Sequence, residues 1–252
     1  MIFSSTSLDI TGRTLHHKFS NRIADVRFTF IDSIRSMNPD SLYVQDIEKT
    51  LKDDNWVERF LEWNSGDVKK TVDGIIFSLQ FQKQHRVRDL KDTDFPEEFH
   101  ESLFVYQEDR LSRKTMYTRM SRIPMSKDKR GWLNQFALFM YFKAEETRGD
   151  RGYINIQDYK DVSLTSLDMD LIYSMIALKD IFPASSSLFI TVNVPFYAKT
   201  IYNTIKYALP CEQRKGMMIL SESELQQVVH EDNLPKFLGG KCLKETTRFI
   251  KY

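Results

Sequence analysis

The chain has 252 residues, of which 41% are hydrophobic and 28% are charged, a composition that supplies a sizeable core and excludes a disordered protein. The formal net charge of +1 gives no overall attraction to nucleic acid or to an anionic membrane, so any such attraction must come from a local patch. Two cysteines, no secretory signal and no apolar run of the roughly 18 to 20 residues that span a bilayer predict a protein of the reducing cytoplasm.

Residues 1–92 are predicted to form an N-terminal helical subdomain. Four runs in it carry apolar side chains at helical spacing: residues 20–37, 42–51, 53–63 and 68–86. Asn38 and Pro39 end the first run, and Asp67 can cap the last one. Helices this short and amphipathic are expected to form a small bundle that packs on a larger domain.

Residues 93–252 have a different pattern, in which short strand candidates alternate with helical runs. The strand candidates are residues 116–123, 136–142, 153–157, 187–194 and 217–220. The helical runs are residues 167–182, 195–209 and 222–229. This alternation predicts βαβ units, so we expect an α/β domain with a mostly parallel sheet flanked by helices.

No catalytic motif is visible in the chain. It has neither a glycine-rich phosphate-binding loop nor a nucleophile elbow. Its five histidines are scattered along the sequence, so no metal site is expected. Asp168 and Asp170 open a predicted helix, where acidic side chains stabilise the helix dipole, and nothing near Cys211 would activate its thiol. We therefore expect a protein that is not an enzyme and has no cofactor.

Residues 110–130 form a basic segment with a local charge of +7, since eight cationic side chains stand against one acid, Asp128. The eight are Arg110, Arg113, Lys114, Arg119, Arg122, Lys127, Lys129 and Arg130. The segment would either attract an anionic membrane, at about 1 kcal/mol per residue, or form a solvated strand edge. Nucleic acid is not an expected partner, because the segment lacks interleaved exposed aromatic side chains on which bases could stack.

Several short motifs occur in the order and spacing of one family. They are RFLEW (residues 59–63) with GDV (66–68), GYINIQD (152–158), LTSLD (164–168), IFP (181–183) with LFITVNVP (188–195), and NLPKFLGG (233–240). Together they resemble the CRAL-TRIO family of lipid-binding domains over about residues 50–241. Among these domains, the phrase at residues 166–169 and the run to Gly240 are most similar to the CRAL-TRIO domain of motile-sperm-domain proteins.

Two departures from the family pattern bear on structure and specificity. Residues 109–116 occupy the place of a family hairpin that contains glycine and proline, and they contain neither, so the hairpin geometry does not carry over directly. Ala184 stands where members that recognise the inositol head group have an acidic residue. Recognition of inositol phosphates is therefore not expected.

The resemblance implies a sheet floor and helical walls around an apolar cavity that holds one hydrophobic lipid. The expected lining residues are Phe136, Leu138, Met140, Ile154, Ile156, Leu171, Met175, Leu178, Phe189 and Thr191. The helix at residues 195–209 would act as a gate at the membrane, through one broad face that comprises Phe196, Tyr197, Ile201, Tyr202, Ile205 and Leu209. The protein would then carry or sense a lipid and would associate with membranes peripherally and transiently. The alternative is an adaptor of the same fold whose cavity is filled by bulky side chains.

Overall fold

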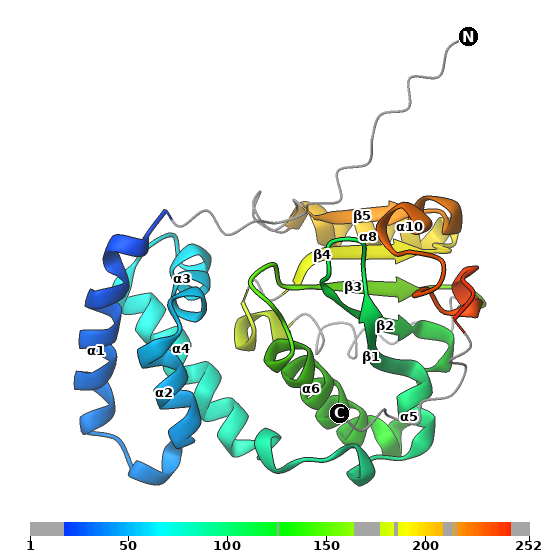
Figure 1. Ribbon diagram of the computed structural model, residues 1–252. Helices are drawn as coiled ribbons and strands as arrows, with labels where there is room; N and C mark the ends of the chain where they lie inside the picture. Colours follow the sequence, from blue (N-terminus) through cyan, green and yellow to red (C-terminus); the bar gives the residue numbers. More distant parts are fainter. Residues whose placement is uncertain are drawn as a thin grey trace.

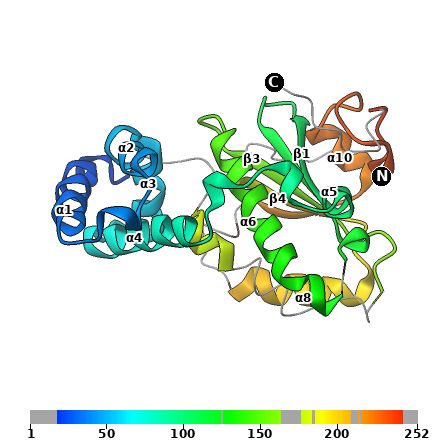
Figure 2. The same cartoon turned by 90° about the horizontal axis from the view of Figure 1, so that it is seen from below.

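The computed structural model describes residues 18–124, 126–163, 177–183, 186–208, 214 and 216–242. Its N-terminal part consists of helices α1 (Ile23–Arg35), α2 (Val44–Lys52), α3 (Asp54–Trp63) and α4 (Val68–Gln84). These helices coincide with the four predicted runs and surround a core of their own, in which Val26, Phe30 and Val57 are fully buried. The bundle lies beside the sheet domain in both ribbon views (Figures 1 and 2).

Side-chain caps explain where two of these helices begin. The Asp53 carboxylate accepts a hydrogen bond from the backbone N–H of Trp56 at 2.9 Å, and Asp67 accepts one from Lys70 at 3.0 Å. Gly66 makes the turn before Asp67 with φ of +80°, and a Cβ there would lie 2.5 Å from the Phe19 ring. Only glycine fits this turn without a shift of its neighbour.

The C-terminal part is built on a five-stranded sheet in the order β1-β2-β3-β4-β5 (Figure 1). The strands are β1 (Leu103–Glu108), β2 (Lys114–Arg119), β3 (Tyr153–Asp158), β4 (Ser186–Val192) and β5 (Met217–Leu220). β1 pairs with β2 antiparallel, and every later pair is parallel. The predicted α/β class with a mostly parallel sheet is confirmed.

Helices cover both faces of this sheet (Figure 2). α6 (Arg130–Glu146) and α8 (Phe196–Ala208) lie on one side, and α10 (Glu222–Val228) lies on the other. Two separate apolar cores correspond to these layers, one containing α6 and the short helix α5 (Glu97–Ser102), the other containing α10. A parallel sheet has to be covered on both faces, and accordingly every residue of β3 is buried, the polar ones included.

The prediction of a strand at residues 136–142 is wrong, because this segment belongs to α6. Along α6 the buried residues recur at helical spacing: Leu133, Phe136, Ala137, Met140 and Ala144 are all at most 6% exposed. The aromatic run between them suggested a buried strand. At 17 residues, however, the element is far longer than a typical strand, and length is what separates these two readings.

The β1–β2 hairpin closes without the glycine and proline of the family pattern, because Asp109 organises the turn. Its carboxylate accepts hydrogen bonds from the backbone N–H groups of Leu111 at 3.0 Å and Arg113 at 2.8 Å. Ser112 adopts φ of +58° between them. The Arg113 guanidinium returns to the same carboxylate, with Nε–Oδ2 at 2.8 Å, and Arg113 Nη1 donates to Ser187 Oγ of β4 at 3.1 Å.

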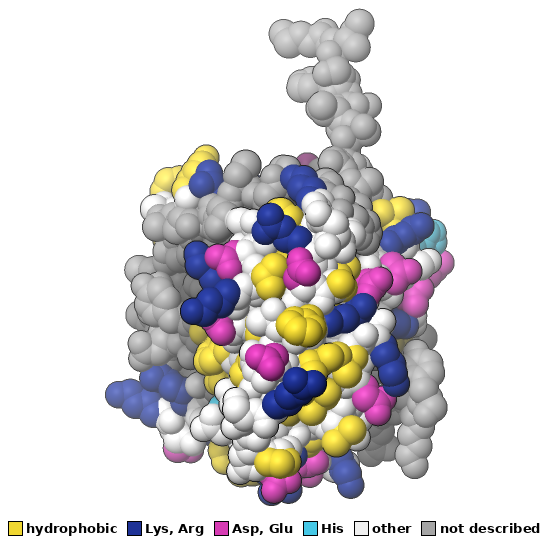
Figure 3. Space-filling view, turned by 90° about the vertical axis from the view of Figure 1, so that its left-hand side faces the viewer, with side chains coloured by type: hydrophobic (Ala, Val, Ile, Leu, Met, Phe, Trp, Pro, Cys, Tyr) yellow, Lys and Arg dark blue, Asp and Glu magenta, His cyan; other side chains and the backbone are white. Residues whose placement is uncertain are grey.

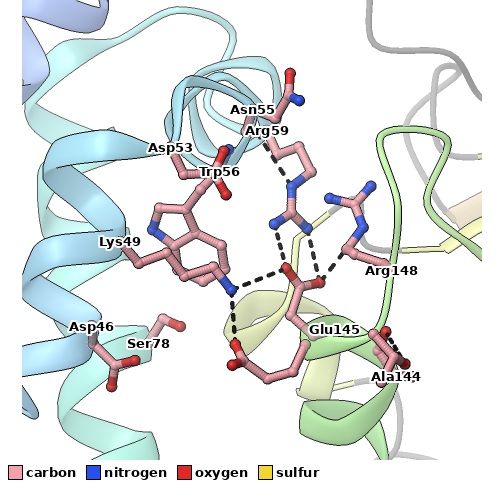
Figure 4. Close-up of polar contacts among 12 residues, drawn as sticks. Asp46, Lys49, Asp53, Asn55, Trp56, Arg59, Ser78, Ala144, Glu145 and Arg148 are labelled. Atoms are coloured by element: carbon pink, nitrogen blue, oxygen red, sulfur yellow. Dashed lines mark hydrogen bonds and ion pairs between the residues drawn. The ribbon is translucent and has the colours of Figure 1, made fainter.

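A buried cluster of ion pairs joins the helical bundle to the sheet domain (Figure 4). Arg59 of α3 makes a two-point contact with Glu145 of α6, and its Nη1 donates to Glu145 Oε2 at 3.0 Å. Their side chains are 1% and 2% exposed. Arg148 approaches the same carboxylate at 4.0 Å, and Lys49 of α2 bridges to it and to Glu146. The two parts of the chain are thus held by charge complementarity as well as by apolar packing.

Candidate lipid-binding site

The sheet face turned toward α6 and α8 is termed the α6/α8 face. It presents Met116 and Thr118 of β2, Tyr153, Asn155 and Gln157 of β3, Phe189 and Thr191 of β4, and Met217 and Ile219 of β5. The Asn155 amide donates a hydrogen bond to Tyr141 Oη of α6 at 3.2 Å, which shows that this face of β3 is turned toward α6. Side chains alternate along a strand, so the other positions follow from the pairing register. Lys206 of α8 donates to the Met217 carbonyl at 2.7 Å and ties α8 to β5.

Three of the predicted lining residues belong to the helix that covers this face. Phe136, Leu138 and Met140 are 0%, 2% and 0% exposed and form part of the core between α6 and the sheet. Leu178 is 8% exposed and joins the same core. Leu171 and Met175 lie outside the described residues.

The predicted lining residues of the sheet are divided between its two faces. Phe189 and Thr191 are on the α6/α8 face, whereas Ile154 and Ile156 point the other way and pack in the core of α10. The alternation of residues along a strand could not reveal which positions face α6 and α8. Both faces of the sheet are buried, so either set of alternate positions can be apolar. Contact of any of these residues with a lipid remains a prediction.

The predicted gate helix forms as α8, but its aromatic residues do not share one face. Phe196 is 88% exposed. In contrast, the Tyr197 hydroxyl donates a hydrogen bond to the Val162 carbonyl, and the Tyr202 hydroxyl is buried. Leu209 lies outside the described residues, as do the side chains of Ile201 and Ile205. An exposed stripe runs along α8 through Phe196, Lys199, Asn203 and Tyr207.

Three of the eight cations of the predicted basic patch pair with acids from outside residues 110–130. Arg113 is buried against Asp109, so its assignment to a surface patch is wrong. Lys114 pairs with Glu108 at 3.0 Å, and Lys129 pairs with Glu98 at 2.7 Å. The Arg119 guanidinium lies 4.3 Å from the centre of the Phe237 ring. Arg110 donates a hydrogen bond to the Gln226 carbonyl, and Arg130 is partly buried. Arg110, Arg122 and Lys127 are exposed, so the basic surface is smaller than the eight cations of the sequence suggested.

A polar network and an open groove lie at the carboxyl ends of the parallel strands. Asp158 accepts hydrogen bonds from the Asn193 amide at 2.9 Å and the Lys160 backbone at 3.0 Å, and Asn193 also donates to Glu222 at 3.1 Å. Burial raises the pKa of Asp158, and these hydrogen bonds offset the rise only in part. The groove beside them has a volume of about 740 Å³. Because these bonds connect β3, β4 and α10, we assign the network a structural role.

Sequence reasoning missed the polar residues of the α6/α8 face. Thr118, Asn155 and Gln157 are 1%, 1% and 7% exposed, yet no apolar pattern selects them. The available signal was the alternation within GYINIQD, where two amide side chains stand at every second position. That spacing places both amides on one face of a strand.

A mostly parallel sheet with helices on both faces places this part of the chain in the class of α/β domains. The family model of the CRAL/TRIO domain matches residues 98–240, more than half of the chain. The chain therefore belongs to the CRAL/TRIO domain family. Its fold is also similar to the crystal structure of Sfh5, with a TM-score of 0.65 and 15% sequence identity over 91% of this chain and 87% of that one. The resemblance to motile-sperm-domain proteins stays a prediction.

Proposed function

We propose that the protein binds one hydrophobic lipid between the sheet and helices α6 and α8, and exchanges it with membranes or senses it there. The observation that carries the proposal is membership of the CRAL/TRIO family over residues 98–240, which contain the entire sheet and both helices. An acyl chain buried in an apolar layer gains roughly 0.8 kcal/mol per CH₂ group. No catalytic step is part of the proposal, and the prediction that the protein is not an enzyme stands untested.

The test of lipid binding is native mass spectrometry of the protein purified from cells, followed by solvent extraction and identification of the lipids. We expect one lipid per protein chain. A protein that is empty after purification and takes up no fluorescent lipid from vesicles would contradict the proposal. That result would favour the adaptor alternative, in which the fold serves only protein interactions.

Transient membrane contact is proposed to involve the exposed stripe of α8. Phe196 and Tyr207, near its two ends, are 88% and 70% exposed, and Lys199 and Asn203 lie between them. Aromatic side chains beside lysines suit the interface between lipid head groups and acyl chains. Within the described ranges, no helix has the length and apolarity of a bilayer-spanning segment. A contact of this kind would be peripheral, and it fits a cytoplasmic protein.

Phe196→Asp is expected to slow transfer of a fluorescent lipid between vesicles by about tenfold or more, because it places a charge where an apolar ring would enter the interface. The matched control is Phe28→Asp on α1, since Phe28 is 76% exposed and lies on the helical bundle. The bundle side of the molecule interleaves basic, acidic and apolar side chains (Figure 3). Equal transfer rates for the two variants, with both folded by circular dichroism, would refute a membrane role for α8.

A further inference from the structure

A row of polar side chains crosses the otherwise apolar α6/α8 face. Thr118, Gln157 and Thr191 are direct neighbours in the pairing register of β2, β3 and β4, and adjacent strands lie about 4.8 Å apart. Asn155 stands two residues before Gln157 on the same face of β3. These four residues, the polar row, are all at most 7% exposed.

Three members of the polar row have polar atoms without a partner. Among the described residues, nothing hydrogen-bonds to Thr118 Oγ1, Asn155 Oδ1 or Thr191 Oγ1. Gln157 is partly satisfied, because its Oε1 accepts from the Tyr159 hydroxyl at 3.4 Å. Buried polar groups are nearly always paired. The hydroxyls of Thr115 and Tyr117, on the opposite face of β2, also have no partner among the described residues, but only the α6/α8 face has such groups on three adjacent strands. This cluster points to a partner from outside the described residues.

Helix α8 contributes a further unpaired group on the side that faces the sheet. The Tyr202 hydroxyl is buried and has no partner in the described part of the chain. Tyr202 lies one helical turn from Ala198, which is 5% exposed, and one turn from Lys206, which is bonded to β5. Burial raises the pKa of Tyr202 to about 12, so at neutral pH its hydroxyl keeps its proton and can donate it.

The charge of the surroundings limits the chemistry of the missing partner. Neither the polar row nor its neighbours on the same face, Met116, Phe189, Met217 and Ile219, carry a charged side chain. Lys206 of α8 lies beside this face, but its ammonium donates to the Met217 carbonyl at the β5 edge of the sheet. An ionised group buried against the polar row and these neighbours would find no counter-charge among them, which is strongly unfavourable. Hydroxyl and amide groups, in contrast, can both donate to and accept from an uncharged partner.

We propose that the polar row and Tyr202 bind the uncharged, hydroxyl-bearing head of a lipid, which is buried against the sheet while its hydrocarbon chain occupies the apolar remainder of the layer. The inference rests on the proposed lipid-binding function and deepens it by naming the class of ligand. Monoacylglycerols and long-chain alcohols have this chemistry. Saturated hydrocarbons, esters without a hydroxyl and ionised fatty acids lack it.

The test compares monoolein with methyl oleate, two uncharged esters of the same fatty acid: monoolein is the glycerol ester and has two free hydroxyls, whereas methyl oleate is the methanol ester and has none. Each is delivered from cyclodextrin, and the bound fraction is measured by native mass spectrometry. We expect the wild-type protein to prefer monoolein by about tenfold, as one or two net hydrogen bonds would provide. In the double variant Thr118→Val/Thr191→Val the preference should fall to about twofold or less, because valine keeps the shape and removes the hydroxyl.

The matched control is Thr115→Val, at a buried threonine of the same strand whose side chain points to the opposite face. It should leave the preference unchanged. Equal binding of both lipids by the wild type, or an unchanged preference in the double variant, would mean that the polar row holds only water, and would overturn this inference while lipid binding stands. Binding of neither lipid, nor of any other lipid offered, would instead refute the proposed function. If the double variant fails to fold, the inference is tested by the preference of the wild type for monoolein and by the decrease of that preference in the single variant Thr191→Val.

Discussion

Glu145→Gln is expected to lower the free energy of unfolding by about 3 to 5 kcal/mol, the cost of leaving a buried charge without its partner. The substitution removes the negative charge that Arg59, Arg148 and Lys49 surround at the junction of bundle and sheet domain (Figure 4). Arg59 would remain buried, at 1% exposure, with only a neutral amide to accept its hydrogen bonds. Urea unfolding monitored by circular dichroism measures the change.

The same cluster predicts how stability depends on pH. Burial raises the pKa of Glu145, but attraction to Arg59 and Arg148 and the hydrogen bond from Arg59 outweigh it, so the pKa lies below its ordinary value. A group with a lowered folded-state pKa stabilises the fold above its unfolded pKa, about 4.3 for glutamate, and this contribution is lost as the pH falls through the folded value. Below about pH 4.3, stability should fall more steeply in the wild type than in Glu145→Gln.

The control for this prediction is Glu146→Gln, one residue further along α6. Glu146 also pairs with Lys49, at 3.0 Å, but its side chain is 36% exposed. Exposed pairs contribute about 0 to 1 kcal/mol, so this variant should unfold almost as the wild type does. Equal losses in the two variants would show that burial of the Arg59–Glu145 pair is not what makes it important.

Arg113→Met is expected to cost a similar amount, about 3 to 5 kcal/mol. Asp109 is fully buried at the side chain, and without Arg113 its carboxylate would lose its counter-ion in the tight β1–β2 turn. The link from the Arg113 guanidinium to Ser187 of β4 would also be lost. Lys114→Met is the matched control, because Lys114 is adjacent but its pair with Glu108 is 32% and 42% exposed. Thermal unfolding of both variants measures the change in the free energy of unfolding. A decrease of less than about 1 kcal/mol for Arg113→Met would contradict the prediction.

The helices of the bundle and most of the strands could be predicted because their signals are local. Asp53 and Asp67 cap helices through residues three positions away, and a glycine turn precedes Asp67. The prediction for residues 136–142 was wrong because this apolar run is continuous, so neither a period of two nor a period of 3.6 stands out within seven residues. Only its extension to 17 residues, packed along its length on the sheet, makes it a helix.

The candidate site depended far more on contacts that sequence order does not reveal. Arg113 reads as one cation among eight in residues 110–130, and only the folded hairpin brings it onto Asp109. Ile154 and Asn155 are equally buried neighbours, and only the packing of α6 and α10 decides which one faces the proposed lipid layer.

By itself, the sequence determined the α/β class, the helical bundle and, through its ordered motifs, the CRAL/TRIO family. These follow from local periodicity, capping and the order of short motifs along the chain. The tertiary structure alone decided that three cations of the basic segment pair with acids, that α8 exposes Phe196 while burying the Tyr202 hydroxyl, and that polar groups cross the α6/α8 face. The physical reason is that charge pairing, burial and strand register join residues far apart in the chain, and no local pattern encodes which partner a side chain will meet.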